Sequence, residues 1–257
     1  MLVLGVDTSG RNGGVALARG DAGRFELIGS AAISGGSYSA QLVPRITNLL
    51  GAYKILKTQL EGFAVASGPG SFTGLRVGIA AVKALAEALD KPIAAVSVLE
   101  AIAVLTIEQQ RKIAANDPDS RERQVRSQRL ITLLDAGRNE IYLGEYNWAA
   151  GRLSCARELL LGSDELLQHV SHLAAGVAVI STPEPLLASM LAENEMSVIA
   201  VPRPNPETIA RIGMEKLMRG ETVPSETLDA NYIRRSDAEI FSLPKLQDST
   251  PPKTRSG

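Results

Sequence analysis

Two aspartates, Asp7 and Asp135, are the side chains of this sequence best placed for chemistry. Each directly follows a short apolar run, residues 2–6 and residues 130–134, and each is followed by turn-forming residues. A carboxylate at such a strand end can hold a hydrated Mg²⁺ beneath a nucleotide phosphate. The alternative, which these residues favour, is that each aspartate accepts hydrogen bonds from the backbone of its own turn.

Few other residues have side chains suited to catalysis or metal binding. His169 and His172 lie three apart on an expected helix, one turn after Glu165, but no further metal ligand is evident. We therefore expect polar residues on a solvated helix face. Cys155 is the only cysteine, and we expect an inert, half-buried thiol in a reducing compartment. The sequence predicts no catalytic residue, no metal and no cofactor.

The glycine-rich segment SGPGSFTGLR, residues 67–76, leaves an expected strand and enters an expected helix. Free backbone N–H groups at such a point can bind an anion. The glycines are spaced one residue too far apart for a dinucleotide fingerprint, and Leu75 follows Gly74 where a P-loop needs lysine. We predict a tight turn with Ser71 as the N-cap of the helix.

The helix expected over residues 71–89 has two apolar faces. Its larger residues form the natural sheet-facing stripe, namely Leu75, Ile79, Val82, Ala86 and Leu89. Its smaller residues lie roughly opposite, namely Val77, Ala80, Ala81, Ala84 and Ala88, with a polar line of Arg76, Lys83 and Glu87 between the faces. Small side chains let another helix approach closely. That helix could belong to another protein or to this chain, and the spacing leaves both open.

The elements that position these residues repeat. The first hundred residues read β-β-β-α-β-α-β-α, and the second half starts in the same way, with an apolar strand, an aspartate, a turn and a strand. We expect an α/β protein made of two copies of a β-β-β-α-β-α unit. The expected divisions are an N-terminal lobe at 1–109, a charged connection at 110–129, a C-terminal lobe at 130–241 and a disordered tail at 242–257.

Composition limits the partners. The 257 residues carry 27 basic and 28 acidic side chains, a net charge of −1, and 45% are hydrophobic. These values exclude a disordered chain and argue against nucleic-acid binding by bulk electrostatics. Arg121, Arg123, Arg126 and Arg129 could touch RNA phosphates, but we favour a charged surface loop. No apolar run is long enough to span a membrane, and we expect a cytoplasmic protein.

Five blocks of this sequence resemble the TsaB (YeaZ) family, in family order and over nearly the whole chain. They are VDTS at 6–9, SGPGSFTGLRVG at 67–78, VSVLEA at 96–101, LDA at 134–136 with EIY at 140–142, and YIR at 232–234. The resemblance implies the actin/Hsp70/sugar-kinase (ASKHA) fold with two ribonuclease-H-like lobes. It also implies a non-catalytic dimerisation subunit that partners TsaD in forming N6-threonylcarbamoyladenosine at position 37 of tRNAs reading ANN codons.

Further partners follow from the resemblance: the ATPase TsaE, a second copy of the chain when it is alone, and tRNA only through the complex. The implied interface lies on the helix after Ser37 and the helix from Ser71. Its candidate residues are Tyr38, Leu42, Thr73, Arg76, Val77, Ala80, Ala81, Ala84 and Ala88. Asp7 and Asp135 then become vestiges of a phosphate site.

Three departures support a scaffold role over the alternative, an ATP-dependent or glycoprotease-like enzyme of the same fold. TsaD proteins bind metal through histidines on their first helix, and residues 37–41 here contain none. The family commonly has Asp-Ala-Arg where this chain has Asp135-Ala136-Gly137. ATP-using members place glycines after a second-lobe strand, where this chain has Ser181-Thr182-Pro183.

Overall fold

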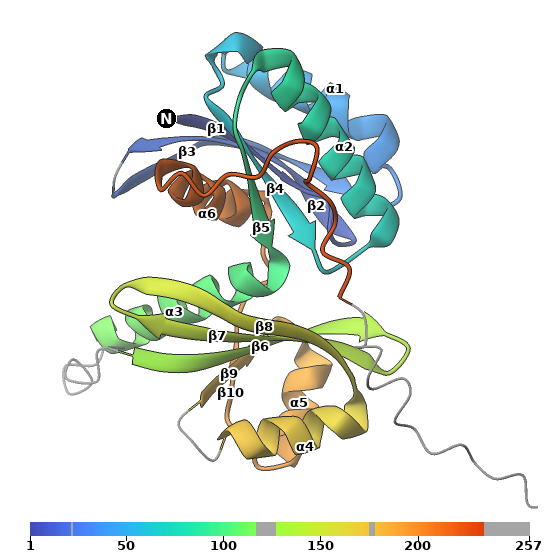
Figure 1. Cartoon of the computed structure of the whole chain (residues 1–257), viewed down its shortest axis with the longest axis vertical. Coiled ribbons are helices and arrows are strands. Elements are labelled where there is room, and N and C mark those ends of the chain that lie inside the picture. The colour runs from blue at the N-terminus through green and yellow to red at the C-terminus, as the bar shows by residue number, and fades with distance from the viewer. Residues whose placement is uncertain (22, 117–126, 175–177, 234–257) are drawn as a thin grey trace, which may run out of the picture.

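Two lobes, each built on a five-stranded mixed sheet, make up the computed structural model of the chain (Figure 1). The structure describes residues 1–21, 23–116, 127–174 and 178–233. Arg121, Arg123, Arg126 and the expected tail at 242–257 lie outside these ranges. No helix within the described residues is long and apolar enough to cross a membrane.

The two sheets have the same topology. The first has the order β3-β2-β1-β4-β5 and the second the order β8-β7-β6-β9-β10. In each, three antiparallel strands are extended by two parallel ones. The first sheet comprises β1 (Leu2–Asp7), β2 (Asn12–Asp21), β3 (Arg24–Ser34), β4 (Gly62–Gly68) and β5 (Ile93–Ser97). The second comprises β6 (Ser127–Gly137), β7 (Glu140–Ala149), β8 (Arg152–Gly162), β9 (Ala178–Thr182) and β10 (Val198–Ala200). The repeat expected from the sequence is confirmed, except that β10 was not anticipated.

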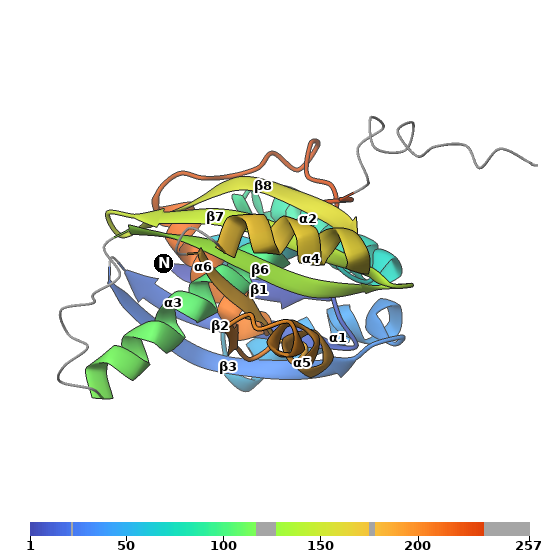
Figure 2. The same cartoon turned by 90° about the horizontal axis from the view of Figure 1, so that it is seen from below.

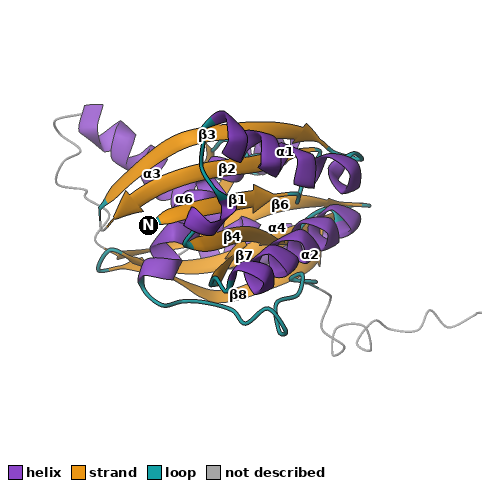
Figure 3. Ribbon diagram, turned by 90° about the horizontal axis from the view of Figure 1, so that it is seen from above, coloured by secondary structure: helices purple, strands orange, loops and turns teal. Residues whose placement is uncertain are grey.

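Helices cover both faces of each sheet. They are α1 (Tyr38–Ala52), α2 (Phe72–Leu89), α3 (Val98–Asn116), α4 (Ser163–Ala174), α5 (Pro185–Glu193) and α6 (Pro206–Met218), with a short 3₁₀ helix at Lys57–Gln59. Helices α1 and α2 lie side by side on the outer face of the first sheet (Figure 3), and α4 and α5 on the outer face of the second (Figure 2). Between the sheets, α6 covers the first and α3 the second (Figure 1).

The position of α6 corrects the lobe boundaries expected from the sequence. Residues 206–232 were expected in the second lobe, yet α6 packs on β1, β2, β4 and β5 of the first. Small residues allow this close contact: a Cβ added at Gly213 would lie 2.1 Å from Cβ of Ala64, and one at Gly5 would lie 2.6 Å from Cβ of Ala210. The inner face of the first sheet is apolar and must be covered, and the returning chain supplies the cover.

The expected connection at 110–129 is also shorter at both ends. Helix α3 continues to Asn116, and β6 already begins at Ser127. Arg129 is therefore a strand residue, exposed and paired with Asn147 and Ala178. A single apolar core runs from the inner face of the first sheet through α6 and α3 to the second sheet. The lobes thus share packed side chains where α3 and α6 meet.

Helix α2 begins as the sequence predicts. The Ser71 hydroxyl accepts a hydrogen bond from the Gly74 N–H at 3.3 Å, which confirms Ser71 as the N-cap. Leu75, Ile79, Val82 and Ala86 are buried against the sheet, while Leu89 is half-buried. The predicted sheet-facing stripe is therefore confirmed over most of its length.

Candidate functional site

Helix α2 presents an outer face of mostly small residues, hereafter the outer α2 face. It consists of Thr73, Arg76, Ala80, Ala84 and Ala88, all exposed. Two other residues expected there, Val77 and Ala81, are half-buried. They pack against the apolar core between α1, α2 and the first sheet, hereafter the outer core of the first lobe. The second apolar face predicted from the sequence therefore exists, but it is narrower than predicted, because only the residues that point away from the sheet are exposed.

Helix α1 borders this face but presents different residues from those expected. Tyr38 and Leu42 are buried within the first lobe, and the Tyr38 hydroxyl donates a hydrogen bond to the Gly10 carbonyl at 2.8 Å. Both belong to the buried stripe of α1, so neither lies on its outer face. The large exposed apolar residue of α1 is Val43, at 58% exposure, which the sequence analysis had not selected.

A segment following α6, residues 223–233 and hereafter the strap, borders α2 on another side. The Lys83 ammonium donates to the Leu228 carbonyl at 3.1 Å, and Arg76 Nε donates to the Tyr232 hydroxyl at 2.9 Å. The Arg76 guanidinium also lies 3.8 Å from the ring centre of Phe72, which is 53% exposed. Two of the three residues in the predicted polar line of α2 thus bind this chain's own strap.

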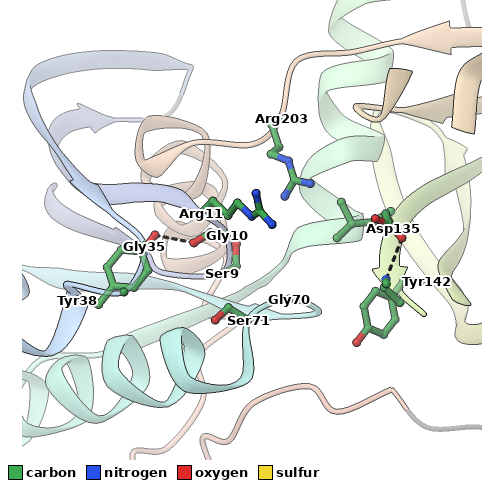
Figure 4. Close-up of a pocket in the computed structure, with 14 residues that line it drawn as sticks. Ser9, Gly10, Arg11, Gly35, Tyr38, Gly70, Ser71, Asp135, Tyr142 and Arg203 are labelled. Carbon is green, nitrogen blue, oxygen red and sulfur yellow. Dashed lines mark hydrogen bonds between the residues drawn. The ribbon is translucent and has the colours of Figure 1, made fainter. Parts of the chain in front are cut away.

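A second candidate site is a cleft of about 390 Å³ between the lobes (Figure 4). Its first-lobe wall includes the loops after β1, β3 and β4, and its second-lobe wall is the end of β6 with Tyr142 of β7. The side chains of Arg11 and Arg203 point into it (Figure 4). Its lining residues are Ser9, Gly10, Arg11, Gly35, Gly36, Tyr38, Gly70, Ser71, Leu134, Asp135, Ala136, Gly137, Tyr142 and Arg203.

The two aspartates hold their own turns. Asp7 Oδ1 accepts hydrogen bonds from the Ser9 N–H at 2.9 Å and the Ser9 hydroxyl at 2.7 Å. Asp135 Oδ1 accepts from the Gly137 N–H at 2.8 Å. Burial raises the pKa of Asp7, against the opposing effects of the Ser9 hydrogen bonds and the Arg203 charge. The turn-capping interpretation is confirmed, and of the two only Asp135 lines the cleft.

The remaining candidates are dispersed. His169 Nε2 lies 2.9 Å from Glu145 Oε1, which also accepts from Arg157, and the His172 side chain is outside the described residues. Among the described side chains, no three histidine, cysteine or acidic residues gather as a metal site. Cys155 is exposed, not half-buried as expected. Although the residue is exposed, partial desolvation of its sulfur, together with the nearby Glu158 and Glu100 charges, raises the pKa of the thiol to about 11.

The end of β9, where the segment Ser181-Thr182-Pro183 contains no glycine, is filled by polar side chains. Thr182 Oγ1 donates to the Leu133 carbonyl at 3.0 Å and accepts from the Glu184 N–H at 3.1 Å. Glu184 in turn forms an ion pair with Arg203, one of the residues that line the cleft. Of the residues in these contacts, only Arg203 lines the cleft.

Comparisons with known proteins identify the family. The model for TsaD, the tRNA N6-adenosine threonylcarbamoyltransferase, matches residues 32–201. The tRNA threonylcarbamoyladenosine biosynthesis protein TsaB of Bacillus subtilis is 28% identical over 93% of this chain and 96% of its own length. The transferase of Legionella pneumophila (strain Lens) is 35% identical over 39% of this chain and 34% of its own.

A solved structure shows the same fold. YeaZ from Pseudomonas aeruginosa superimposes with a TM-score of 0.62 and 24% identity, over 89% of this chain and 99% of that one. The sequence blocks, the repeated sheet topology and these matches agree over nearly the whole length. The chain belongs to the TsaB (YeaZ) family of tRNA threonylcarbamoyladenosine biosynthesis proteins, within the wider family described by the TsaD model.

Proposed function

We propose that this chain is the non-catalytic subunit that binds a TsaD-like transferase through the outer α2 face. The transferase would form N6-threonylcarbamoyladenosine at position 37 of tRNAs reading ANN codons, in the cytoplasm. The observation that carries the proposal is that Ala80, Ala84 and Ala88 are exposed along successive turns of one helix. Within the described residues, the strap and α1 border this face without burying these alanines.

The chemistry of the face suits a helical partner. Alanines let a facing helix pack at close interaxial distance. A standard protein interface buries about 1,600 Å² in total, more than one helix face supplies. Val43 on the neighbouring α1 and Phe72 at the start of α2 are further exposed apolar side chains on these two helices. Helices from two subunits could then pack together as a bundle.

Other parts of the proposal rest on the family and the topology. The repeated strand order supports an ASKHA-type fold with two ribonuclease-H-like lobes. The interface would serve a second copy of this chain when the transferase is absent, and a TsaE-like ATPase would complete the complex. This subunit would meet tRNA only through that complex. The carboxylates of Asp7 and Asp135, already engaged in their own turns, support a role without catalysis.

The test replaces Ala84 with glutamate and measures co-elution with the organism's own TsaD-like protein in gel filtration. A buried, unpaired carboxylate is costly, so we expect Ala84→Glu to lose the complex. Ala115→Glu is the matched control, because Ala115 is an exposed alanine of α3 on another side of the molecule. Circular dichroism should show both variants folded. Co-elution of folded Ala84→Glu at the wild-type level would refute the proposal.

The cleft supports one alternative function, an ATP-dependent or glycoprotease-like enzyme. Two arginines and Asp135 face the cleft of about 390 Å³, and such a site could receive phosphates. Titration calorimetry of the isolated chain with ATP and Mg²⁺ separates the two functions. Tight stoichiometric binding would favour the enzyme.

A further inference from the structure

Glu158, on β8 of the second lobe, accepts hydrogen bonds from three different elements. Its Oε1 accepts from the Ser97 hydroxyl at 2.5 Å and from the Tyr146 hydroxyl at 2.5 Å. Its Oε2 accepts from the Asn231 amide at 2.5 Å. Tyr146 belongs to β7 of the same sheet, whereas Ser97 ends β5 of the first sheet and Asn231 lies in the strap. One carboxylate therefore joins both lobes.

The strap end of this bridge is anchored in the first lobe. The Asn231 backbone N–H donates to the Ser67 carbonyl at 2.7 Å, at the end of β4. Leu228 and Ala230 are buried in the outer core of that lobe, at 3% and 7% exposure. Lys83 adds its hydrogen bond to the Leu228 carbonyl. The Asn231 side chain is therefore held rigidly to the first lobe, so its hydrogen bond to Glu158 connects that lobe to the second.

The bridging side chains do not line the cleft themselves, but two of the strands involved lead to its walls. Ser67 is the first residue of the glycine-rich segment, whose Gly70 and Ser71 line the first-lobe wall of the cleft. Glu158 pairs with Gly144 on β7, the strand that also carries Tyr142 of the opposite wall. The lobes are also joined by the apolar core through α3 and α6. Tyr146 belongs to that core and also binds Glu158, so the polar bridge extends the apolar connection to Ser97 and to the strap and thereby restricts rotation of one lobe against the other.

We propose that Glu158 and Asn231 form a latch that holds the two lobes at one angle and so fixes the width of the interlobe cleft. Hydrogen bonds to an ionised carboxylate are roughly twice as strong as neutral ones, which suits a single side chain to this role. The latch involves neither the outer α2 face nor any partner, so it stands independently of the proposed docking function.

The latch is tested by measuring interlobe distances in the full chain. Spin labels are placed on cysteines introduced at Arg45 of α1 and Gln168 of α4, both exposed and on different lobes, in a Cys155→Ser background. Double electron–electron resonance should give one narrow distance distribution. Asn231→Ala removes only the side-chain amide and keeps the backbone bond to Ser67. We expect it to broaden the distribution and add a second distance.

Glu158→Gln keeps the size of the side chain but removes its charge, and we expect the same broadening. Glu226→Gln is the matched control, since Glu226 is an exposed carboxylate of the strap, and it should leave the distribution narrow. If Glu158→Gln fails to fold, Asn231→Ala alone decides. A narrow, wild-type distribution in folded Asn231→Ala would overturn the latch.

Discussion

Replacing Gly78 on α2 with alanine is expected to lower the stability of the fold. This reverses the usual effect of replacing a helical glycine with alanine. A Cβ added there would lie 2.2 Å from Oγ1 of Thr8, far inside the 3.4–4 Å of ordinary van der Waals contact. Rotating the threonine does not help, since its Cγ2 already lies 3.3 Å from the same point. A Cβ added at Gly74, one turn earlier, would lie 2.1 Å from the Thr8 carbonyl oxygen, so α2 packs closely on Thr8 over both turns.

The magnitude follows from two opposing effects. In an unobstructed helix, alanine is favoured over glycine by about 1 kcal/mol. Inserting a methyl into a well-packed site costs about 1–3 kcal/mol, and the upper end applies where the neighbour is fully buried, as Thr8 is. We therefore expect Gly78→Ala to lower the free energy of unfolding by about 2 kcal/mol. For a protein of this size the melting temperature should fall by about 4–8 °C.

Thermal and urea denaturation, followed by circular dichroism, measure this change. Gly51→Ala is the matched control, because Gly51 lies in α1 with no atom within 4 Å of its added Cβ. It should raise the unfolding free energy by about 0.5–1 kcal/mol.

A second variant isolates the contact. Thr8→Ala removes the obstructing hydroxyl, which lacks a hydrogen-bond partner among the described residues. The loss in unfolding free energy of the double variant Thr8→Ala/Gly78→Ala should be smaller than the sum of the two single losses by about 1 kcal/mol or more. Gly78→Ala with unchanged or higher stability would refute the steric reasoning, and so would additive losses.

Two further predictions concern titratable groups. Burial raises the pKa of Glu145, but hydrogen bonds and charges from its arginine and histidine neighbours outweigh it, so the pKa lies below the ordinary value of a glutamate. A carboxyl with a lowered folded-state pKa stabilises the fold above its unfolded pKa, and this is lost as the pH falls through the folded value. Urea denaturation should therefore show a smaller acid-side loss in Glu145→Gln than in wild type, and equal losses would contradict this. Cys155, with its pKa raised to about 11, should react with iodoacetamide slowly at neutral pH, and Glu158→Gln should speed the reaction by removing a nearby negative charge. A rate matching that of a free thiol would exclude the raised pKa.

Local patterns predicted most of the secondary structure. The period of the apolar residues gave the sheet-facing stripe of α2, and turn-forming residues gave the loop after β1. Both depend on neighbours within a few residues along the chain, which is the range over which such patterns carry information. The prediction of Ser71 as the N-cap of α2 also rested on residues next to it in the chain.

Other features depended on contacts that no local pattern contains. Tyr38 and Leu42 were expected on the interface because their helix was, yet they belong to its buried stripe, and Val43, which follows Leu42 in the chain, is the exposed residue. The return of α6 to the first sheet joins residues about two hundred positions apart. The Glu158 bridge likewise brings together Ser97, Tyr146 and Asn231, and no spacing rule connects them.

The exchange of helices between the halves has a consequence for synthesis on the ribosome. The sheet formed by the first hundred residues keeps one apolar side bare until α6 has been translated, because that helix supplies its cover. During this interval Val3, Ala16 and Ala64 face water or a chaperone instead of their final neighbours. Premature termination before residue 206 would therefore release a fragment prone to aggregate, even though every strand of its first sheet is present.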